Sequence, residues 1–307
     1  MIKTFIACAA AIILFPPLYA QNDSIPPAIA DTVEVMTDTL VVDTIPVVRY
    51  NATDIGAPKP SVYKIKPAID LPLFAVNAAW SLYALGEIYH KPVSNEEDVL
   101  NLNKNDINGF DRWAVRPYSP HLDKISYLPF QASMPLPLVF LLCKNTRKDF
   151  FKLTFLYLEA MSITGVLYTA STYFVDRYRP YVYSSGTEIS QRINGGGKNS
   201  FYAGHPALVA TSLFFGAKVF SDYYPDSKIK WLLYTAAASI TAYTAYVRLR
   251  GGMHFPSDLL LGVTQGALTG ILVPHFHRHK IIKDPNLSLL PYTNGFNHGL
   301  ALVYKLK

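Results

Sequence analysis

The chain has 307 residues, of which 50% are hydrophobic and only 16% are charged. A soluble globular domain carries about 25% charged residues, so this composition argues against an ordinary cytoplasmic enzyme. It also excludes a disordered chain, a collagen and a coiled coil. The net charge of +6 comes without a long run of Lys or Arg, which favours an anionic membrane or anionic substrate and no nucleic-acid partner.

The first 66 residues differ in character from the rest. Residues 1–20 have the basic start, the apolar stretch and the small-residue cleavage site of a signal peptide. Residues 21–66 are rich in Thr, Val, Asp and Pro without helical periodicity, which predicts an extended or disordered tether outside the cytoplasm. Cleavage would remove Cys8 and leave Cys143 alone, so we expect no internal disulfide.

From residue 67 onward, apolar segments follow one another and predict an all-α, polytopic transmembrane bundle of five or six helices, in a domain over 67–283. The segments lie at 71–88, 125–143, 153–175, 201–217, 231–247 and 259–274.

Two of the predicted elements are short. The first apolar segment has only 16 residues between Leu71 and Gly86, and a bilayer core needs about 20, so we expect it to be interfacial or re-entrant. At the C-terminus, residues 284–307 form a separate tail that alternates like a strand pair around Thr293-Asn294-Gly295.

The order of the segments has a consequence for function. If the third to sixth segments each cross the bilayer, the end of the third, the start of the fourth, the end of the fifth and the start of the sixth share one face. Groups suited to anion chemistry lie at all four points. Arg177-Tyr178-Arg179-Pro180 ends the third segment, and Gly204-His205 begins the fourth, where helix N–H groups favour an anion. Taken alone, each motif has a structural interpretation as a helix end.

The third motif joins the last two segments. It contains Arg248, His254 and Asp258, and the spacing of four puts His254 and Asp258 on one helical face if the helix begins near Phe255. Asp258 would then accept the Nδ1–H of His254 and leave Nε2 as a nucleophile or base. An isolated pair at this spacing is more often structural, but the three motifs together favour a site.

These residues resemble the type 2 phosphatidic acid phosphatase and vanadium haloperoxidase superfamily, whose pattern is K-x6-R-P, then P-S-G-H, then S-R-x5-H-x3-D. Arg179-Pro180 and Gly204-His205 match the ends of the first two motifs, and Arg248, His254 and Asp258 match the third at full spacing. The resemblance covers about residues 110–278.

Four motif positions differ. Thr172 stands at the motif lysine, Tyr202 and Ala203 at the proline and serine, and Val247 at the leading serine. One cation and one hydroxyl that would hold phosphate in the family pattern are therefore missing from this chain. The candidates for the missing charge are Arg177, Lys198 and Arg250.

The resemblance implies an integral-membrane lipid phosphatase of a phosphomonoester or pyrophosphate lipid. In that mechanism His254 forms a phosphohistidine and His205 protonates the leaving group. Arg179, Arg248 and the Gly204 N–H hold the phosphoryl oxygens. No metal and no cofactor is expected. The alternatives are a vanadate-dependent haloperoxidase-like enzyme and, given Thr172 and Ala203, a non-catalytic phospholipid-binding relative.

The resemblance also implies a location in a bacterial cell membrane with an outward-facing site, and we expect a periplasmic or extracellular catalytic face. Two features of the apolar segments are structural predictions. Gly262, Gly266 and Gly270 recur every four residues, which favours close approach of another helix. Glu159 is a costly carboxylate inside an apolar segment, so it should be paired or lie in a polar cavity.

Overall fold

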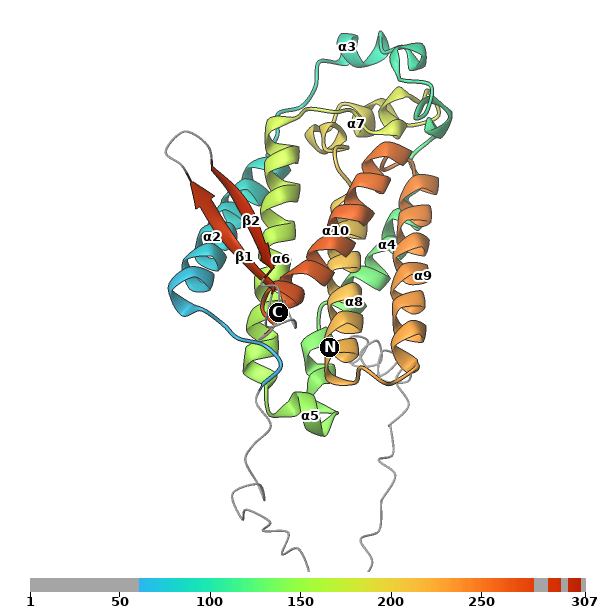
Figure 1. Cartoon of the computed structure of the whole chain (residues 1–307). Helices are drawn as coiled ribbons and strands as arrows, with labels where there is room; N and C mark the ends of the chain where they lie inside the picture. The colour runs from blue at the N-terminus through green and yellow to red at the C-terminus, as the bar shows by residue number, and fades with distance from the viewer. Residues whose placement is uncertain (1–60, 279–286, 294–297, 305–307) are drawn as a thin grey trace, which may run out of the picture.

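The computed structural model describes residues 61–278, 287–293 and 298–304, which form a helical bundle followed by a hairpin (Figure 1). The predicted signal peptide and nearly all of the predicted tether lie outside the described residues. The α-helices are α2 (Pro67–Tyr89), α3 (Glu96–Leu100), α4 (Pro120–Ser133), α5 (Lys144–Arg147), α6 (Phe150–Phe174), α7 (Ile189–Arg192), α8 (Gly204–Tyr223), α9 (Ile229–Arg250) and α10 (Pro256–Phe276). Short 3-10 turns cover Lys104–Asp106, Arg112–Ala114, Leu136–Leu141, Pro180–Tyr183 and Gly195–Lys198.

Three of the described helices, α2, α6 and α10, are long and apolar enough to cross a membrane. This supports a membrane location and agrees with the predicted helical membrane fold. After the bundle, β1 (Leu287–Thr293) and β2 (His298–Tyr304) pair antiparallel, with Leu290 opposite Ala301.

The first apolar segment is longer than its sequence suggested. α2 has 23 residues, which is about 34 Å of helix and enough for a hydrocarbon core of about 30 Å. Pro67 at the first helical turn needs no N–H partner, and Asp70 is buried and accepts the Lys66 N–H at 2.6 Å. These two residues extend the helix beyond its purely apolar part, so the expectation that this segment is too short to span is wrong.

α2 runs beside α6 in the same direction. Phe74 packs on Phe155 near the start of both helices, with ring centroids 5.9 Å apart. At the other end, Lys91 Nζ donates to the Thr172 carbonyl at 2.7 Å. Residues 61–66 therefore lie at the end of the bundle opposite to the end of α6.

The second apolar segment is broken by its prolines. α4 ends at Ser133, and a 3-10 turn over Leu136–Leu141 follows Pro135. Proline lacks the N–H that an α-helix needs, so Pro135 and Pro137 prevent a single continuous helix over 125–143.

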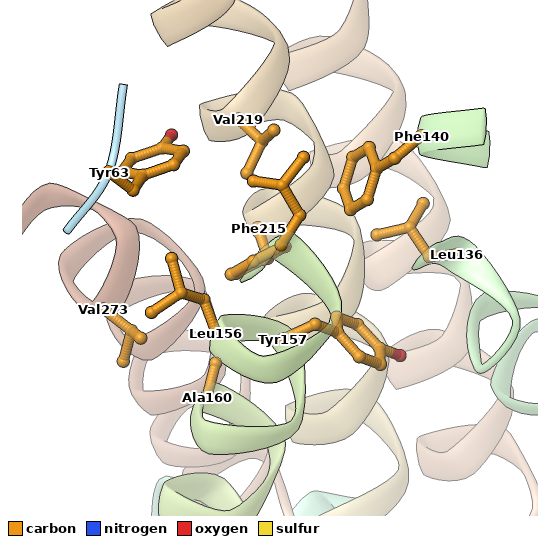
Figure 2. Close-up of a cluster of buried hydrophobic side chains, with 10 residues drawn as sticks. Tyr63, Leu136, Phe140, Leu156, Tyr157, Ala160, Phe215, Val219 and Val273 are labelled. Carbon is orange, nitrogen blue, oxygen red and sulfur yellow. The ribbon is translucent and has the colours of Figure 1, made fainter. Parts of the chain in front are cut away.

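A hydrophobic core joins α6, α8, α10 and the chain before α2 (Figure 2). Phe215 of α8 is fully buried, and its ring lies 5.6 Å from that of Tyr157. Tyr63 is also fully buried, and its hydroxyl donates to Asp222 at 2.8 Å. The packed bundle therefore begins before residue 67, inside the segment that the sequence assigned to the tether.

The four points that carry the sequence motifs share one end of the bundle, as the helix order predicts. Figure 1 shows α3 and α7 at this end, next to the end of α9 and the start of α10, whereas α5 lies at the opposite end. Backbone hydrogen bonds connect the loops here, from the Arg179 N–H to the Gly197 carbonyl (2.8 Å) and from the Ala203 N–H to the Asp258 carbonyl (3.2 Å).

The predicted glycine row of α10 packs directly on the backbone of α8. A Cβ added at Gly262 would lie 2.5 Å from the Ala203 carbonyl oxygen, and one at Gly270 would lie 2.5 Å from that of Thr211. Gly266 faces the Ala207 carbonyl even more closely. Only glycine permits this approach, so the row fixes the position of α10 against α8.

We predict that Gly266→Ala destabilises the bundle by about 1–3 kcal/mol, because the added methyl group forces α10 away from Ala207. Gly86→Ala is the matched control, since nothing lies within 4 Å of a Cβ at that position of α2. Thermal unfolding of the detergent-solubilised protein measures both variants. Equal melting temperatures for the two would contradict this packing role.

Candidate active site

His254 is buried in the loop between α9 and α10, with 2% of its surface exposed. Its Nδ1 lies 2.7 Å from the Ser200 carbonyl oxygen, so Nδ1 carries the proton and donates. Nε2 then presents its lone pair, with Arg248 Nη2 at 3.4 Å. Burial lowers the pKa of His254 well below its usual value, and the charges of Arg179 and Arg248 lower it further. His254 is therefore neutral at pH 7 with an unprotonated Nε2, as a nucleophile requires.

The expected hydrogen bond from His254 to Asp258 is wrong. Asp258 accepts from Ser200 Oγ at 2.6 Å and from the Phe255 N–H at 3.0 Å, and its other oxygen pairs with Arg177. The reason is local. α10 begins at Pro256, so His254 lies outside the helix and the i, i+4 relation does not apply. Asp258 reaches His254 only through Ser200, whose hydroxyl binds the carboxylate and whose carbonyl holds the imidazole.

Arg177 is not a phosphate ligand in this geometry. Its guanidinium pairs with Asp258 and with Asp111, the latter at 2.7 Å, and also donates to Ser257 Oγ at 3.0 Å. Both carboxylates are fully buried. Burial raises the pKa of Asp111, but hydrogen bonds from Ser257, Asn108 and Arg177 outweigh burial and leave that pKa below its usual value. The ion pair is therefore intact at neutral pH.

Arg248 lies at the end of α9 with 2% of its surface exposed. Its Nη1 pairs with Asp123 and donates to Ser126 Oγ at 3.1 Å, both from α4. Its Nε is buried and has no hydrogen-bond partner. The carboxylate and the hydroxyl thus accept from only some of the N–H donors of this guanidinium.

Arg179 is less well paired than Arg248. Its Nη1 lies 3.5 Å from the sulfur of Met253, which is a weak acceptor, and its buried Nε has no hydrogen-bond partner. Met253 directly precedes His254 in the chain, and the charge of Arg179 lowers the pKa of His254. The two arginines place a net positive charge beside the imidazole.

His205 stands at the first turn of α8, as the sequence predicts. Its ring is half-buried and lies edge-on to Tyr127 and Phe130 of α4, at centroid distances of 4.6 and 5.1 Å. Gly204 is buried against Tyr168, and an added Cβ would lie 2.7 Å from that ring. Helix α8 therefore brings His205 and the first-turn backbone to the same end as His254.

The remaining candidates for the missing motif charge lie elsewhere. Lys198 donates to the Pro92 carbonyl at 3.1 Å, and Arg250 is exposed at the end of α9. Thr172, at the lysine position, is fully buried, and its hydroxyl lies 3.0 Å from the Tyr168 carbonyl and 3.1 Å from that of Phe201. The lysine that does contact Thr172 is Lys91, whose Nζ donates to the Thr172 carbonyl at 2.7 Å.

Sequence reasoning missed three residues of this site. Ser200 holds His254, Asp111 holds Arg177, and Asp123 is the counter-ion of Arg248. Asp111 and Asp123 lie in the polar stretch 89–124, where nothing in the spacing distinguishes a buried carboxylate from an exposed one. The arginines of the motifs were the available clue, because a buried arginine requires a carboxylate or a bound anion as its partner.

We predict that Arg177→Gln lowers the free energy of unfolding by about 3–5 kcal/mol, because it leaves Asp111 and Asp258 buried without a counter-ion. Arg179→Gln is the matched control, because no described carboxylate pairs with Arg179 and its stability should change little. Thermal unfolding in detergent compares the two. Equal losses would contradict the separate roles of these neighbouring arginines.

Comparison with known proteins gives one family match and one similar solved structure. Residues 153–282 match the family model of the PAP2 superfamily. No curated protein matches the chain. Among solved structures, one described as the first transmembrane PAP2-type phosphatidylglycerolphosphate phosphatase, from Bacillus subtilis, is similar over 70% of this chain and 98% of that chain, at 19% identity and a TM-score of 0.39. The matched residues 153–282 contain Arg179, His205, Arg248, His254 and Asp258, so the similarity to the PAP2 superfamily covers these candidate site residues.

Proposed function

We propose that this chain is an integral-membrane phosphatase that hydrolyses a phosphomonoester or pyrophosphate lipid. The observation that carries the proposal is the pair of buried, unpartnered Nε–H groups on Arg179 and Arg248. Arg248 Nη2 lies 3.4 Å from Nε2 of His254, and the charges of both arginines lower the pKa of that histidine. A buried donor without a partner is costly, and a phosphoryl group supplies the acceptors that these two lack.

The charges support the same ligand class. Of the two guanidiniums, only that of Arg248 pairs with a described carboxylate, that of Asp123. An anion therefore completes the site, whereas an additional cation would not. The candidate spans α6 and α10 flank the motif loops and favour a substrate that reaches the site from the bilayer.

The chemistry follows from the positions of the histidines. Nε2 of His254 attacks phosphorus, a P–N bond forms, and the P–O bond to the lipid alkoxide breaks. His205 acts in this step as an imidazolium, which the bound phosphate anion favours, and becomes neutral when it gives its proton to the leaving oxygen. In the second step His205 removes a proton from water, the resulting hydroxide attacks phosphorus, and the P–N bond breaks to release phosphate. Asp258 is a positioning residue that holds Ser200 and Arg177, and it does not touch the nucleophile.

Arg179→Ala and Arg248→Ala should each lower kcat/KM by about 10²–10³-fold, because each removes a preorganised donor to the developing charge. Arg250→Ala is the control, since Arg250 is exposed near the same loop. Phosphate release from a panel of phosphorylated lipids in detergent measures all three. If the wild-type protein binds these lipids but releases no phosphate from any of them, a non-catalytic lipid-binding role replaces the proposal.

An acid-quench experiment with labelled nitrophenyl phosphate, whose leaving group needs no proton, should distinguish the roles of the two histidines. His254→Ala should never trap label, because it lacks the nucleophile. His205→Ala should accumulate the phosphohistidine, because attack by water is slowed. The reverse pattern would exchange the two roles. Turnover by both variants without trapped label would contradict a covalent intermediate.

We further propose that the catalytic face is periplasmic or extracellular. Four basic residues cluster at the opposite end of the bundle, as cytoplasmic loops favour, namely Lys144, Arg147, Lys148 and Lys152. Because α2 crosses the bundle parallel to α6, this orientation puts Ser61 on the cytoplasmic side. Cleavage after Ala20 with an external tether would put Ser61 outside, so these two predictions compete.

Two cysteines at opposite ends test the orientation. In intact spheroplasts, a membrane-impermeant thiol reagent should label Ser185→Cys in a Cys143→Ala background, since Ser185 is exposed on the catalytic face. The native Cys143 should react only after lysis. The reciprocal labelling pattern would place the catalytic face in the cytoplasm and would favour the cleaved signal peptide.

A further inference from the structure

A second cluster of ionisable side chains lies far from the catalytic end. It consists of Asp70 of α2, Glu159 of α6 and His277, which follows α10. His277 and His254 lie just beyond opposite ends of α10, a helix of 21 residues and about 30 Å. Asp70 and Glu159 are 5% and 2% exposed, so this cluster is buried and separate from the active site.

The three side chains point their ligand atoms at one another. His277 Nε2 lies 3.3 Å from Asp70 Oδ2 and 3.5 Å from Glu159 Oε2. All three atoms lie within 4.8 Å of one another. Around a tetrahedral ion with metal–ligand distances of 2.0–2.2 Å, neighbouring ligand atoms are about 3.3–3.6 Å apart. The two separations from His277 Nε2 fall in this range.

The imidazole is held as a metal ligand would be. His277 Nδ1 lies 2.8 Å from the Val273 carbonyl oxygen, so Nδ1 carries a proton and donates to it. This is the usual outer contact of a metal-bound histidine, and it aims the Nε2 of His277 at the two carboxylates.

Within residues 61–278, no Lys or Arg side chain forms an ion pair with Asp70 or Glu159. Asp70 accepts a hydrogen bond from the Lys66 N–H, and the buried Glu159 Oε2 has no hydrogen-bond partner among the described residues. The neighbouring cations at this end, Lys218 and Arg278, pair with Asp222 instead. Two buried negative charges in a membrane domain are costly, and a divalent ion would neutralise both.

We propose that Asp70, Glu159 and His277 bind a divalent transition-metal ion of the Zn²⁺ class. Ca²⁺ and Mg²⁺ prefer sites made of oxygen ligands alone, so the imidazole nitrogen argues against both ions. One imidazole nitrogen with two carboxylate oxygens is a ligand set that suits Zn²⁺. The side chain of His277 is 13% exposed, so water can occupy the fourth position from that side. Because its ligands come from α2, α6 and the end of α10, the ion would cross-link these three segments at the non-catalytic end.

The test uses the full chain in detergent, stripped with EDTA and titrated with Zn²⁺, with bound metal measured after gel filtration. The wild-type protein should bind about one Zn²⁺ per chain at this site, and Co²⁺ in its place should give the visible absorption of tetrahedral coordination. Glu159→Gln and His277→Ala should weaken binding by about tenfold or more. His275→Ala is the matched control, because that histidine lies on the same helix end outside the cluster.

A melting experiment keeps the test independent of how well the variants fold. Zn²⁺ should raise the melting temperature of the EDTA-treated wild-type protein and of His275→Ala, but not that of Glu159→Gln. The proposal is overturned if the wild-type protein binds no Zn²⁺. It is also overturned if both ligand variants retain Zn²⁺ as His275→Ala does, and in either case a protonated His277 simply pairs with the two carboxylates. Both outcomes are independent of phosphatase activity.

Discussion

The double ion pair of Arg177 with Asp111 and Asp258 organises the catalytic end of the bundle. Arg177 follows α6, Asp258 begins α10, and Asp111 precedes α4, so one guanidinium joins three segments that are far apart in the sequence. A buried ion pair adds little net stability, but breaking it leaves an uncompensated charge. Its main effect is therefore to fix the relative positions of these three segments. The orientation of His254 depends on it indirectly, because Asp258 also binds the hydroxyl of Ser200.

Arg177 and Arg179 show how little residue type says about role. They are separated by a single tyrosine, yet Arg177 satisfies two carboxylates, whereas Arg179 has a sulfur contact and a buried Nε without a partner. The difference lies in which carboxylates the fold brings within reach. An arginine that is fully paired is unavailable to an anion, and one that is poorly paired retains donors for it.

Much of the site was predictable from spacing, and the exceptions have physical reasons. The helix order placed the motifs at one end because adjacent spans must alternate in direction. The His254–Asp258 contact was wrong because a proline sets the start of α10 two residues after His254, and Asp258 instead accepts the Phe255 N–H. The length of α2 was underestimated because Asp70 was taken as a polar boundary, although it is buried inside the helix. Asp123 was missed because pairing between α4 and α9 is a tertiary contact that leaves no local pattern.

The position of Tyr63 relates the architecture to the order of synthesis. Its ring is fully buried, its hydroxyl binds Asp222 at the end of α8, and the next N–H, that of Lys64, donates to the carbonyl of His277 just after α10 at 2.8 Å. A ribosome makes residues 222 and 277 long after residue 63. These native contacts of Tyr63 and Lys64 can therefore form only after α10 has been synthesised, which joins the start of the bundle to its end.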